Sequence, residues 1–167
     1  MGRSGETVKT SVHLLAAESK DLYNRMLSDE EERNLELAGR YIEIVGNPST
    51  GPEDLKAVLD EGLVWREMPN LFAPSGRVSD YATALASFGK GRQYLPEQTY
   101  TLRRAIAGGD SVALEVSWAG EVAKSIGPFA AGSRLSARIA IFLRFRDGKI
   151  VSQTDYPCYD PVAGDTA

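Results

Sequence analysis

Hydrophobic and polar residues alternate along four stretches in the second half of this 167-residue chain. The stretches are 99–107, 112–122, 135–146 and 149 to about 156. From Leu135 to Phe145 every second residue is apolar, and Ser or Arg fills most of the positions between. A period of two gives a strand one apolar face. Because Gly108-Gly109-Asp110 and Asp147-Gly148 are tight-turn sequences, the pattern predicts an antiparallel meander with one face for a core.

In the first half, apolar residues recur at helical spacing instead. Residues 12–27 are predicted to form one helix, and Ser28-Asp29-Glu30-Glu31 is a capping box that opens a second. The apolar stripe of the second helix is Leu35, Ala38, Tyr41, Ile42 and Val45. Gly46-Asn47-Pro48 should end it, because glycine accepts the left-handed C-terminal conformation and proline cannot continue a helix.

Shorter elements connect this helix to the meander. A helix is predicted from Pro52 to about residue 62, then a strand over 63–68 and a loop to about residue 78. Ser79 and Asp80 can cap a further helix that runs through Phe88. Helices first and a long antiparallel sheet after them indicate an α+β fold in which the helices cover one concave side.

Charge and cysteine content narrow the classes of partner. A formal net charge of -4 and a pI near 5.1 argue against nucleic-acid binding, which needs clustered Lys and Arg. The single cysteine, Cys158, excludes an intrachain disulfide and fits a reducing compartment. The chain contains one histidine, His13, so Cys158 and His13 are too few nitrogen and sulfur ligands for a zinc site. We expect no metal and no cofactor.

The longest apolar run is too short to cross a bilayer. It extends from Ile139 to Leu143, and no hydrophobic stretch follows the first residues of the chain. We therefore expect no membrane association and a cytoplasmic location. Arginines recur on the predicted strands, and four of them, at positions 134, 138, 144 and 146, share the parity of one face, which is typical of a solvated sheet face.

Three segments resemble one known superfamily. They are the predicted first strand and its end, 63–70, the turn Asp147-Gly148-Lys149-Ile150-Val151, and the closing Tyr156-Pro157-Cys158-Tyr159-Asp160-Pro161. Together with the element order they resemble the nuclear transport factor 2-like superfamily, particularly its SnoaL-like branch. Pro157 stands where relatives carry an acidic residue, so a role of that carboxylate does not transfer to this chain unless Asp155, two positions earlier, supplies it.

The resemblance implies a cone-shaped, curved antiparallel sheet wrapped around the N-terminal helices. It implies three parts: an extension over 1–29, a cone domain over 30–162 and a tail over 163–167. It also implies a mostly apolar pocket for a small apolar molecule, and a homodimer that pairs through the outer sheet face. A dehydratase-like mechanism is disfavoured, because the matched region contains no histidine for a histidine–aspartate pair.

Candidate catalytic residues are Asp155, Tyr156 and Glu67. Asp155 is the first choice as general acid or base, because a desolvated carboxyl has a raised pKa; its alternative is a solvent-facing residue at a strand end. If Ile150 points inward, strict alternation points Tyr156 inward as well and leaves Asp155 outside unless a bulge intervenes. Tyr156 would donate a hydrogen bond to a substrate carbonyl, or be an aromatic core residue.

Glu67 shares a strand face with Trp65, so both should line the pocket if one does. The alternative for Glu67 is an ion pair with an arginine of a neighbouring strand. Six aromatic residues are expected in the pocket wall or core: Trp65, Trp118, Tyr41, Tyr81, Phe88 and Phe142.

Two functions remain open at this point. The first is a cofactor-independent acid/base enzyme, an isomerase, cyclase or related lyase or hydrolase, acting on an apolar carbonyl-bearing or polycyclic metabolite in the manner of SnoaL-like cyclases and ketosteroid-isomerase-like proteins. The second is a non-catalytic ligand-binding or dimeric assembly module. A buried carboxylate in the pocket would favour the first.

Overall fold

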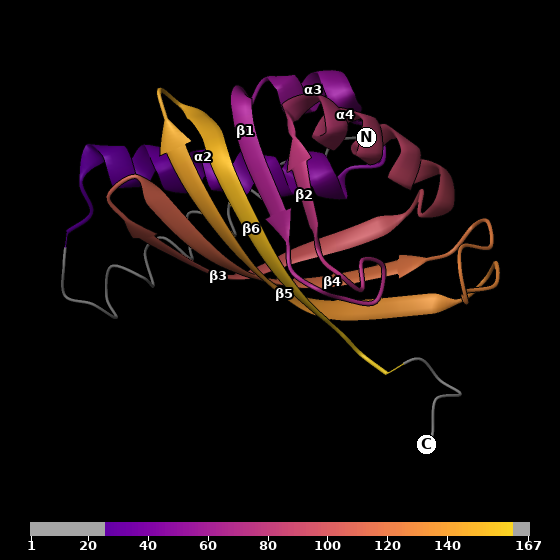
Figure 1. Ribbon diagram of the computed structural model, residues 1–167. Coiled ribbons are helices and arrows are strands. Elements are labelled where there is room, and N and C mark those ends of the chain that lie inside the picture. The colour runs from indigo at the N-terminus through magenta and orange to yellow at the C-terminus, as the bar shows by residue number, and fades with distance from the viewer. Residues whose placement is uncertain (1–25, 162–167) are drawn as a thin grey trace, which may run out of the picture.

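The computed structural model describes residues 26–161, in which three helices lie against one side of a curved six-stranded sheet (Figure 1). The elements are α2 (Asp29–Gly46), α3 (Pro52–Lys56), β1 (Leu59–Glu67), β2 (Arg77–Asp80), α4 (Tyr81–Tyr94), β3 (Gln98–Gly108), β4 (Ser111–Glu121), β5 (Arg134–Arg146) and β6 (Lys149–Tyr159). The predicted α+β class is confirmed. The helix predicted over 12–27 falls almost wholly outside the described residues, and the three-part division of the chain stays a prediction.

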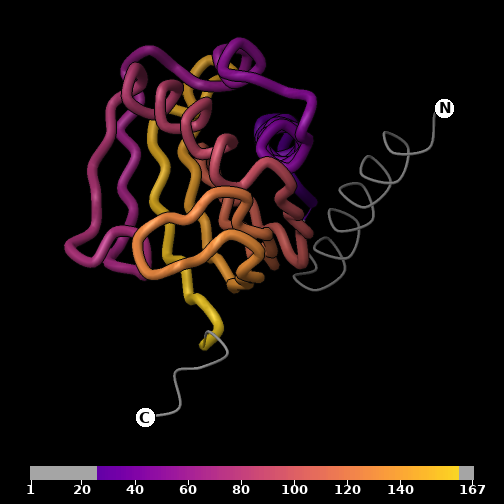
Figure 2. The backbone as a smooth tube through the Cα atoms, turned by 90° about the vertical axis from the view of Figure 1, so that its right-hand side faces the viewer, coloured from indigo at the N-terminus to yellow at the C-terminus, as the bar shows by residue number. Residues whose placement is uncertain are grey.

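The strands follow the order β2-β1-β6-β5-β4-β3. The antiparallel meander of β3 to β6 is confirmed, and β1 adds to its edge in parallel with β6. Residues 77–80, predicted as the end of a loop and the cap of the next helix, also form β2 and pair with β1. Irregular register in β1, β3 and β6 marks bulges, which increase the twist of a sheet. The sheet curves without closing, and the helices fill its concave side (Figure 2).

Helix α2 begins with the predicted capping box. Ser28 Oγ accepts from the Glu31 amide at 3.2 Å, and the Glu31 carboxylate accepts from the Ser28 amide at 2.8 Å. The helix ends at Gly46 as predicted, but not through a left-handed glycine, because Asn47 at the C-cap is extended. Two side chains cap it instead, because Thr50 Oγ1 and Arg92 Nη2 of α4 both donate to the carbonyl oxygen of Ile44, at 2.5 and 3.1 Å. Side chains, rather than a left-handed glycine, thus bond to this carbonyl at the end of the helix.

The two other helices differ in length from the prediction. α3 stops at Lys56, because the chain enters β1 at Leu59, where the side chain becomes buried. α4 begins at the predicted cap, with Asp80 Oδ1 accepting from the Thr83 amide at 2.8 Å, and continues to Tyr94. Packing of α4 against β1 outweighs the low helix propensity of its glycines.

The outer face of the sheet carries three ion pairs. Arg134, Arg138 and Arg144 of β5 pair there with Glu121, Glu115 and Asp110. These pairs are solvent-exposed, which matches the predicted solvated face. The homodimer expected through this face stays a prediction. Within the described residues no helix is both long and apolar enough to cross a membrane.

Candidate functional site

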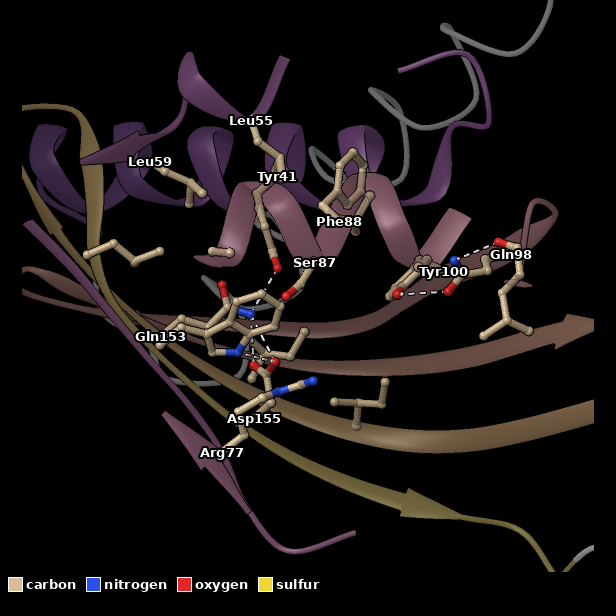
Figure 3. A pocket seen from close by; sticks show the side chains of 18 residues that line it. Tyr41, Leu55, Leu59, Arg77, Ser87, Phe88, Gln98, Tyr100, Gln153 and Asp155 are labelled. Atoms are coloured by element: carbon tan, nitrogen blue, oxygen red, sulfur yellow. Dashed lines mark hydrogen bonds between the residues drawn. The ribbon is translucent and has the colours of Figure 1, made fainter. Parts of the chain in front are cut away.

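A cavity of about 220 Å³ lies between α4 and the concave face of the sheet. Its apolar walls include Val45, Leu59, Leu63, Phe88, Ile139 and Ile141. Side chains from α2, α4 and the sheet converge there, as the close view shows (Figure 3). Because apolar groups surround it, any carboxyl group inside loses most of its hydration.

A bulge in β6 decides which side chains enter this cavity. Ser152 pairs with Arg144 and Ile150 with Phe145, so Val151 is an extra residue in β6. Ile150 points inward, and after the bulge Gln153 and Asp155 do so too, with exposed fractions of 2% and 8%. Strict alternation from Ile150 was therefore wrong for the end of this strand.

Tyr156 consequently lies on the outer face. It is 44% exposed and packs edge-on against Phe142, which is 52% exposed, with ring centroids 5.8 Å apart. The inward placement of Tyr156 and the pocket-wall placement of Phe142 are both corrected. The bulge at Val151 turns Tyr156 outward. Phe142 faces outward because it pairs with Thr154, which lies on the outer face of the sheet.

Asp155 is held by two nitrogen donors. Trp65 Nε1 donates to its Oδ2 at 2.7 Å, and Gln153 Nε2 lies 2.9 Å from Oδ1 and 3.0 Å from Oδ2. Burial raises the pKa of Asp155 from its ordinary 3.8 to about 7, although the hydrogen bonds from Gln153 and Trp65 act in the opposite direction. A carboxyl with this pKa exchanges a proton readily at neutral pH.

Gln153 links this carboxyl to a tyrosine of α2. Its Nε2 also donates to Tyr41 Oη at 2.9 Å (Figure 3). The amide nitrogen must face Asp155, because an ionised carboxylate only accepts hydrogen bonds. Since Tyr41 Oη accepts from Gln153, its own hydroxyl proton is available for a group in the cavity. Burial, and then the charge of Asp155, raise the pKa of Tyr41 well above its usual value, so the phenol keeps that proton.

Glu67 forms the ion pair that was its alternative role. It stands directly opposite Arg77 in the β1–β2 ladder, and the Arg77 guanidinium donates a hydrogen bond to the Glu67 carboxylate in an ion pair. Arg77 lines the cavity close to Asp155, whereas Glu67 does not line it (Figure 3). The charge of Glu67 raises the pKa of Asp155 and that of Arg77 lowers it, both less than burial does.

The other predicted residues divide between cavity and core. Trp65, Tyr41 and Phe88 line the cavity, as expected of a pocket wall. Trp118 and Tyr81 do not line it; both pack in the hydrophobic core.

Sequence reasoning missed five polar or charged lining residues: Arg77, Ser87, Gln98, Tyr100 and Gln153. Gln153 carried a usable signal, because it is two residues from Asp155 and must share its face. The side chains of the described region form no cluster of three or more His, Cys, Asp or Glu suited to a metal ion.

Comparisons with known proteins agree with this architecture. The family model for the SnoaL-like domain matches residues 38–153. The match ends two residues before Asp155, so it does not include that carboxyl. Among curated proteins, no sequence matches the chain with significance.

Solved structures share the fold at low identity. IdmH from Streptomyces antibioticus, a proposed polyketide cyclase, is 18% identical with a TM-score of 0.63, over 74% of this chain and 91% of that one. A proposed SnoaL-like polyketide cyclase from Jannaschia is 14% identical with a TM-score of 0.68, over 80% and 90%. An LEH-like epoxide hydrolase from M. tuberculosis is 17% identical with a TM-score of 0.60, over 77% and 84%. At these identities the likeness shows the fold alone.

Proposed function

This chain belongs to the SnoaL-like domain family, and on that premise we propose that it is a cofactor-independent acid/base enzyme acting on a small, mainly apolar carbonyl compound. The observation that carries the proposal is Asp155, a buried carboxyl with a pKa of about 7 that opens into an apolar cavity. Catalytic acids and bases need a pKa near the operating pH, and burial supplies it here.

In the proposed mechanism Asp155 is the general base. Its ionised oxygen takes a proton from the carbon next to the substrate carbonyl, and the C–H electron pair becomes the carbon–carbon double bond of an enolate. Tyr41 donates its hydroxyl proton as a hydrogen bond to the enolate oxygen, where negative charge develops. If the substrate carries a β,γ carbon–carbon double bond, the enolate is a dienolate, and Asp155 can return the proton to its γ carbon, which gives the conjugated isomer. In a substrate with a second carbonyl, the enolate carbon can attack it and close a ring, and the alkoxide that forms takes the proton back from Asp155.

Tyr41 thus takes the role that the sequence assigned to Tyr156. Both are tyrosines that could polarise a carbonyl, but only Tyr41 lines the cavity that contains Asp155. Gln153 is a positioning residue in this scheme, because it bonds to the acid/base group and the hydrogen-bond donor at once. Trp65 donates a further hydrogen bond to Oδ2 of the same carboxyl.

Cavity size limits the substrate to about one or two rings. An apolar cavity of about 150 Å³ is large enough to hold benzene, and the cavity here measures about 220 Å³. We therefore narrow the polycyclic class named from the resemblance to compounds of this size. Because Arg77 lines the cavity, the substrate can carry a polar group on the side that faces this residue.

The test is a screen of one- and two-ring ketones for proton exchange, isomerisation and cyclisation. Asp155→Asn should lower turnover by about a hundredfold or more, the usual effect of losing a general base. Tyr41→Phe should lower it by a similar factor, with KM nearly unchanged, because the donor acts mainly in the transition state. Asp110→Asn is the matched control, since Asp110 pairs with Arg144 on the outer face.

Turnover that is unchanged in Asp155→Asn would contradict the proposal. Ligand binding without turnover in either protein would support the alternative, a non-catalytic binding module.

A further inference from the structure

A second polar group faces the same cavity and takes no part in the proton transfer. It consists of Tyr100 and Gln98 of β3, which line the cavity, and Trp118 of β4 behind them. Trp118 Nε1 donates to Gln98 Oε1 at 2.9 Å, and Gln98 Nε2 donates to the carbonyl oxygen of Leu95 at 2.9 Å. Tyr100 Oη donates to Gln98 Oε1 over a longer 3.3 Å.

Chemistry fixes the orientation of the Gln98 amide. An indole N–H can only donate and a backbone carbonyl can only accept, so Oε1 must face Trp118 and Nε2 must face Leu95. Within the described residues Nε2 makes this one hydrogen bond, which leaves its second N–H. The Trp118 indole also hydrogen-bonds to the Tyr100 hydroxyl, so Tyr100 Oη keeps one acceptor lone pair. Its long bond to Gln98 is easily exchanged. The group therefore offers both a donor and an acceptor to a ligand.

The two polar groups lie at opposite ends of the cavity (Figure 3). In the sheet, Tyr100 pairs with Trp118, and the row continues through Ala137 to Tyr159 of β6. Asp155 is four residues before Tyr159, which is about 13 Å of strand. Two strands, β4 and β5, also separate β3 from β6.

The wall between these ends is apolar. Ile139, Ile141 and Phe88 line it. A ligand that bridges the two groups must therefore have an apolar middle and a polar atom at each end.

We propose that the ligand of this cavity carries two oxygen functions at its opposite ends, a carbonyl beside Asp155 and Tyr41 and a hydroxyl beside Tyr100 and Gln98. The assignment of the carbonyl to the Asp155 end rests on the proposed function. A hydroxyl fits the other end better than an ether, because it can donate to Tyr100 Oη while accepting from the Gln98 amide. The ligand class is a hydroxylated aryl ketone of one or two rings.

An anion is less suited to the Tyr100 end. Burial raises the pKa of Tyr100 well above its usual value, so this phenol stays neutral. The charge of Arg92 reaches Tyr100, but Arg92 Nη2 is bonded to the Ile44 carbonyl and to Thr50 Oγ1. A neutral hydroxyl needs no free cation.

The test compares matched ketones that differ by one hydroxyl. Calorimetry measures the Kd of acetophenone and of benzylacetone, each with and without a para-hydroxyl, below neutral pH where the phenol is uncharged. The distance from the carbonyl to the para-hydroxyl differs between the two ketones. With the carbonyl at Asp155, one of them should therefore place its hydroxyl at Tyr100. In the wild type we expect the para-hydroxyl of that pair to tighten binding about three- to tenfold, the range of one net hydrogen bond. The ortho isomers, whose hydroxyl does not point away from the side chain that carries the carbonyl, should gain nothing.

The variants locate that gain. Tyr100→Phe should remove the advantage of the para-hydroxyl, and Gln98→Met should reduce it. Tyr94→Phe is the control, because Tyr94 lies on α4 and does not line the cavity. Three results would each overturn the proposal. The para-hydroxyl could have no effect in either pair, both hydroxylated ketones could fail to bind at millimolar concentration, or the advantage could survive in Tyr100→Phe.

Asp155→Asn separates this proposal from the proposed function. It should leave the advantage of the para-hydroxyl intact, because Asp155 does not contact the Tyr100 end. If Asp155→Asn leaves turnover unchanged while Tyr100→Phe removes the advantage, the catalytic role fails and the ligand class stands. If turnover depends on Asp155 but the hydroxyl has no effect, only the ligand class fails.

Discussion

The chemistry of the site depends on a balance of forces on one carboxyl. Burial raises the pKa of Asp155, while the hydrogen bonds from Gln153 and Trp65 lower it. The Trp65 contact is short, at 2.7 Å, and it bonds the charged form. Hydrogen bonds to charged groups contribute about 1.5–3 kcal/mol. Trp65 therefore keeps the pKa of Asp155 from rising far above neutrality.

Trp65→Phe should raise the pKa of Asp155 by about one to two units, because the variant loses a donor to the carboxylate. Carbon-detected NMR titration of the labelled side chain measures it directly. Trp118→Phe is the control, since that indole bonds to Gln98 instead. A pKa that stays near 7 or falls in Trp65→Phe would show that the indole does not set it.

At the residue scale, sequence reasoning found the acid but not its partners. Asp155 was chosen because a carboxyl between strand residues can be desolvated. Tyr41 was assigned to the wall, because nothing local shows that its hydroxyl meets Gln153, 112 residues away. Tyr156 was misplaced because a bulge at Val151 is set by the pairing of β5 with β6, which leaves no mark on the local pattern.

At the element scale, the β1–β2 connection places Arg77 at the cavity. Gly76 has a φ of +70°, and a Cβ there would lie 2.9 Å from the carbonyl oxygen of Glu67. Both the left-handed backbone and the close approach require glycine. The turn therefore fixes where β2 starts and how Arg77 meets Glu67.

Gly76→Ala should lower the free energy of unfolding by about 1–2 kcal/mol or more, because alanine pays for the left-handed conformation and the clash. Gly91→Ala is the control, for which we expect the free energy of unfolding to rise instead of fall. It lies in α4 with no atom within 4 Å of its Cβ, so it should stabilise by about 0.5–1 kcal/mol. Urea unfolding measures both, and equal changes in the two variants would contradict the account of Gly76.

Helix and strand boundaries show the same division between local and distant causes. Ser28 and Asp80 were predicted as caps because capping is local to four residues. β2 was missed, since a four-residue strand gains its stability from pairing with β1 rather than from its own sequence. The end of α2 was predicted at the right residue but with the wrong cap, because the Ile44 carbonyl is bonded by the side chains of Thr50 and of Arg92, and Arg92 is 46 residues beyond Gly46.

At the scale of the whole molecule, the meander and its apolar face were readable from period-two patterns, and the fold followed. The cavity was not, because it needs β1 to join β6 in parallel and α4 to cover the join. That parallel pairing brings Trp65 to Asp155 across 90 residues. The sequence therefore identified the fold and one reactive group, while tertiary packing assembled the rest of the site.

The buried carboxyl should also shape how stability depends on pH. The native state keeps the Asp155 proton up to about pH 7, whereas the unfolded chain releases it near 3.8. Between these values the native state binds more protons, so the contribution of Asp155 to the free energy of unfolding falls as pH rises. It is fully present below about pH 4 and lost above about pH 7. At about 1.4 kcal/mol per pKa unit, the loss is about 4 kcal/mol.

Asp155→Asn should remove this dependence, because the amide does not titrate. Relative to the wild type, the variant should gain stability from about pH 4 to pH 7 and stay more stable above, by up to about 4 kcal/mol. Urea unfolding at several pH values measures the difference between the two proteins, in which the other titrating groups cancel. Asp160→Asn, an exposed residue of the same region, should keep the wild-type profile. If the free energy of unfolding of Asp155→Asn and of the wild type changed with pH in parallel, Asp155 would have an ordinary pKa in the native state. A carboxylate with an ordinary pKa is a poor base at neutral pH, so this result would also weaken the proposed mechanism.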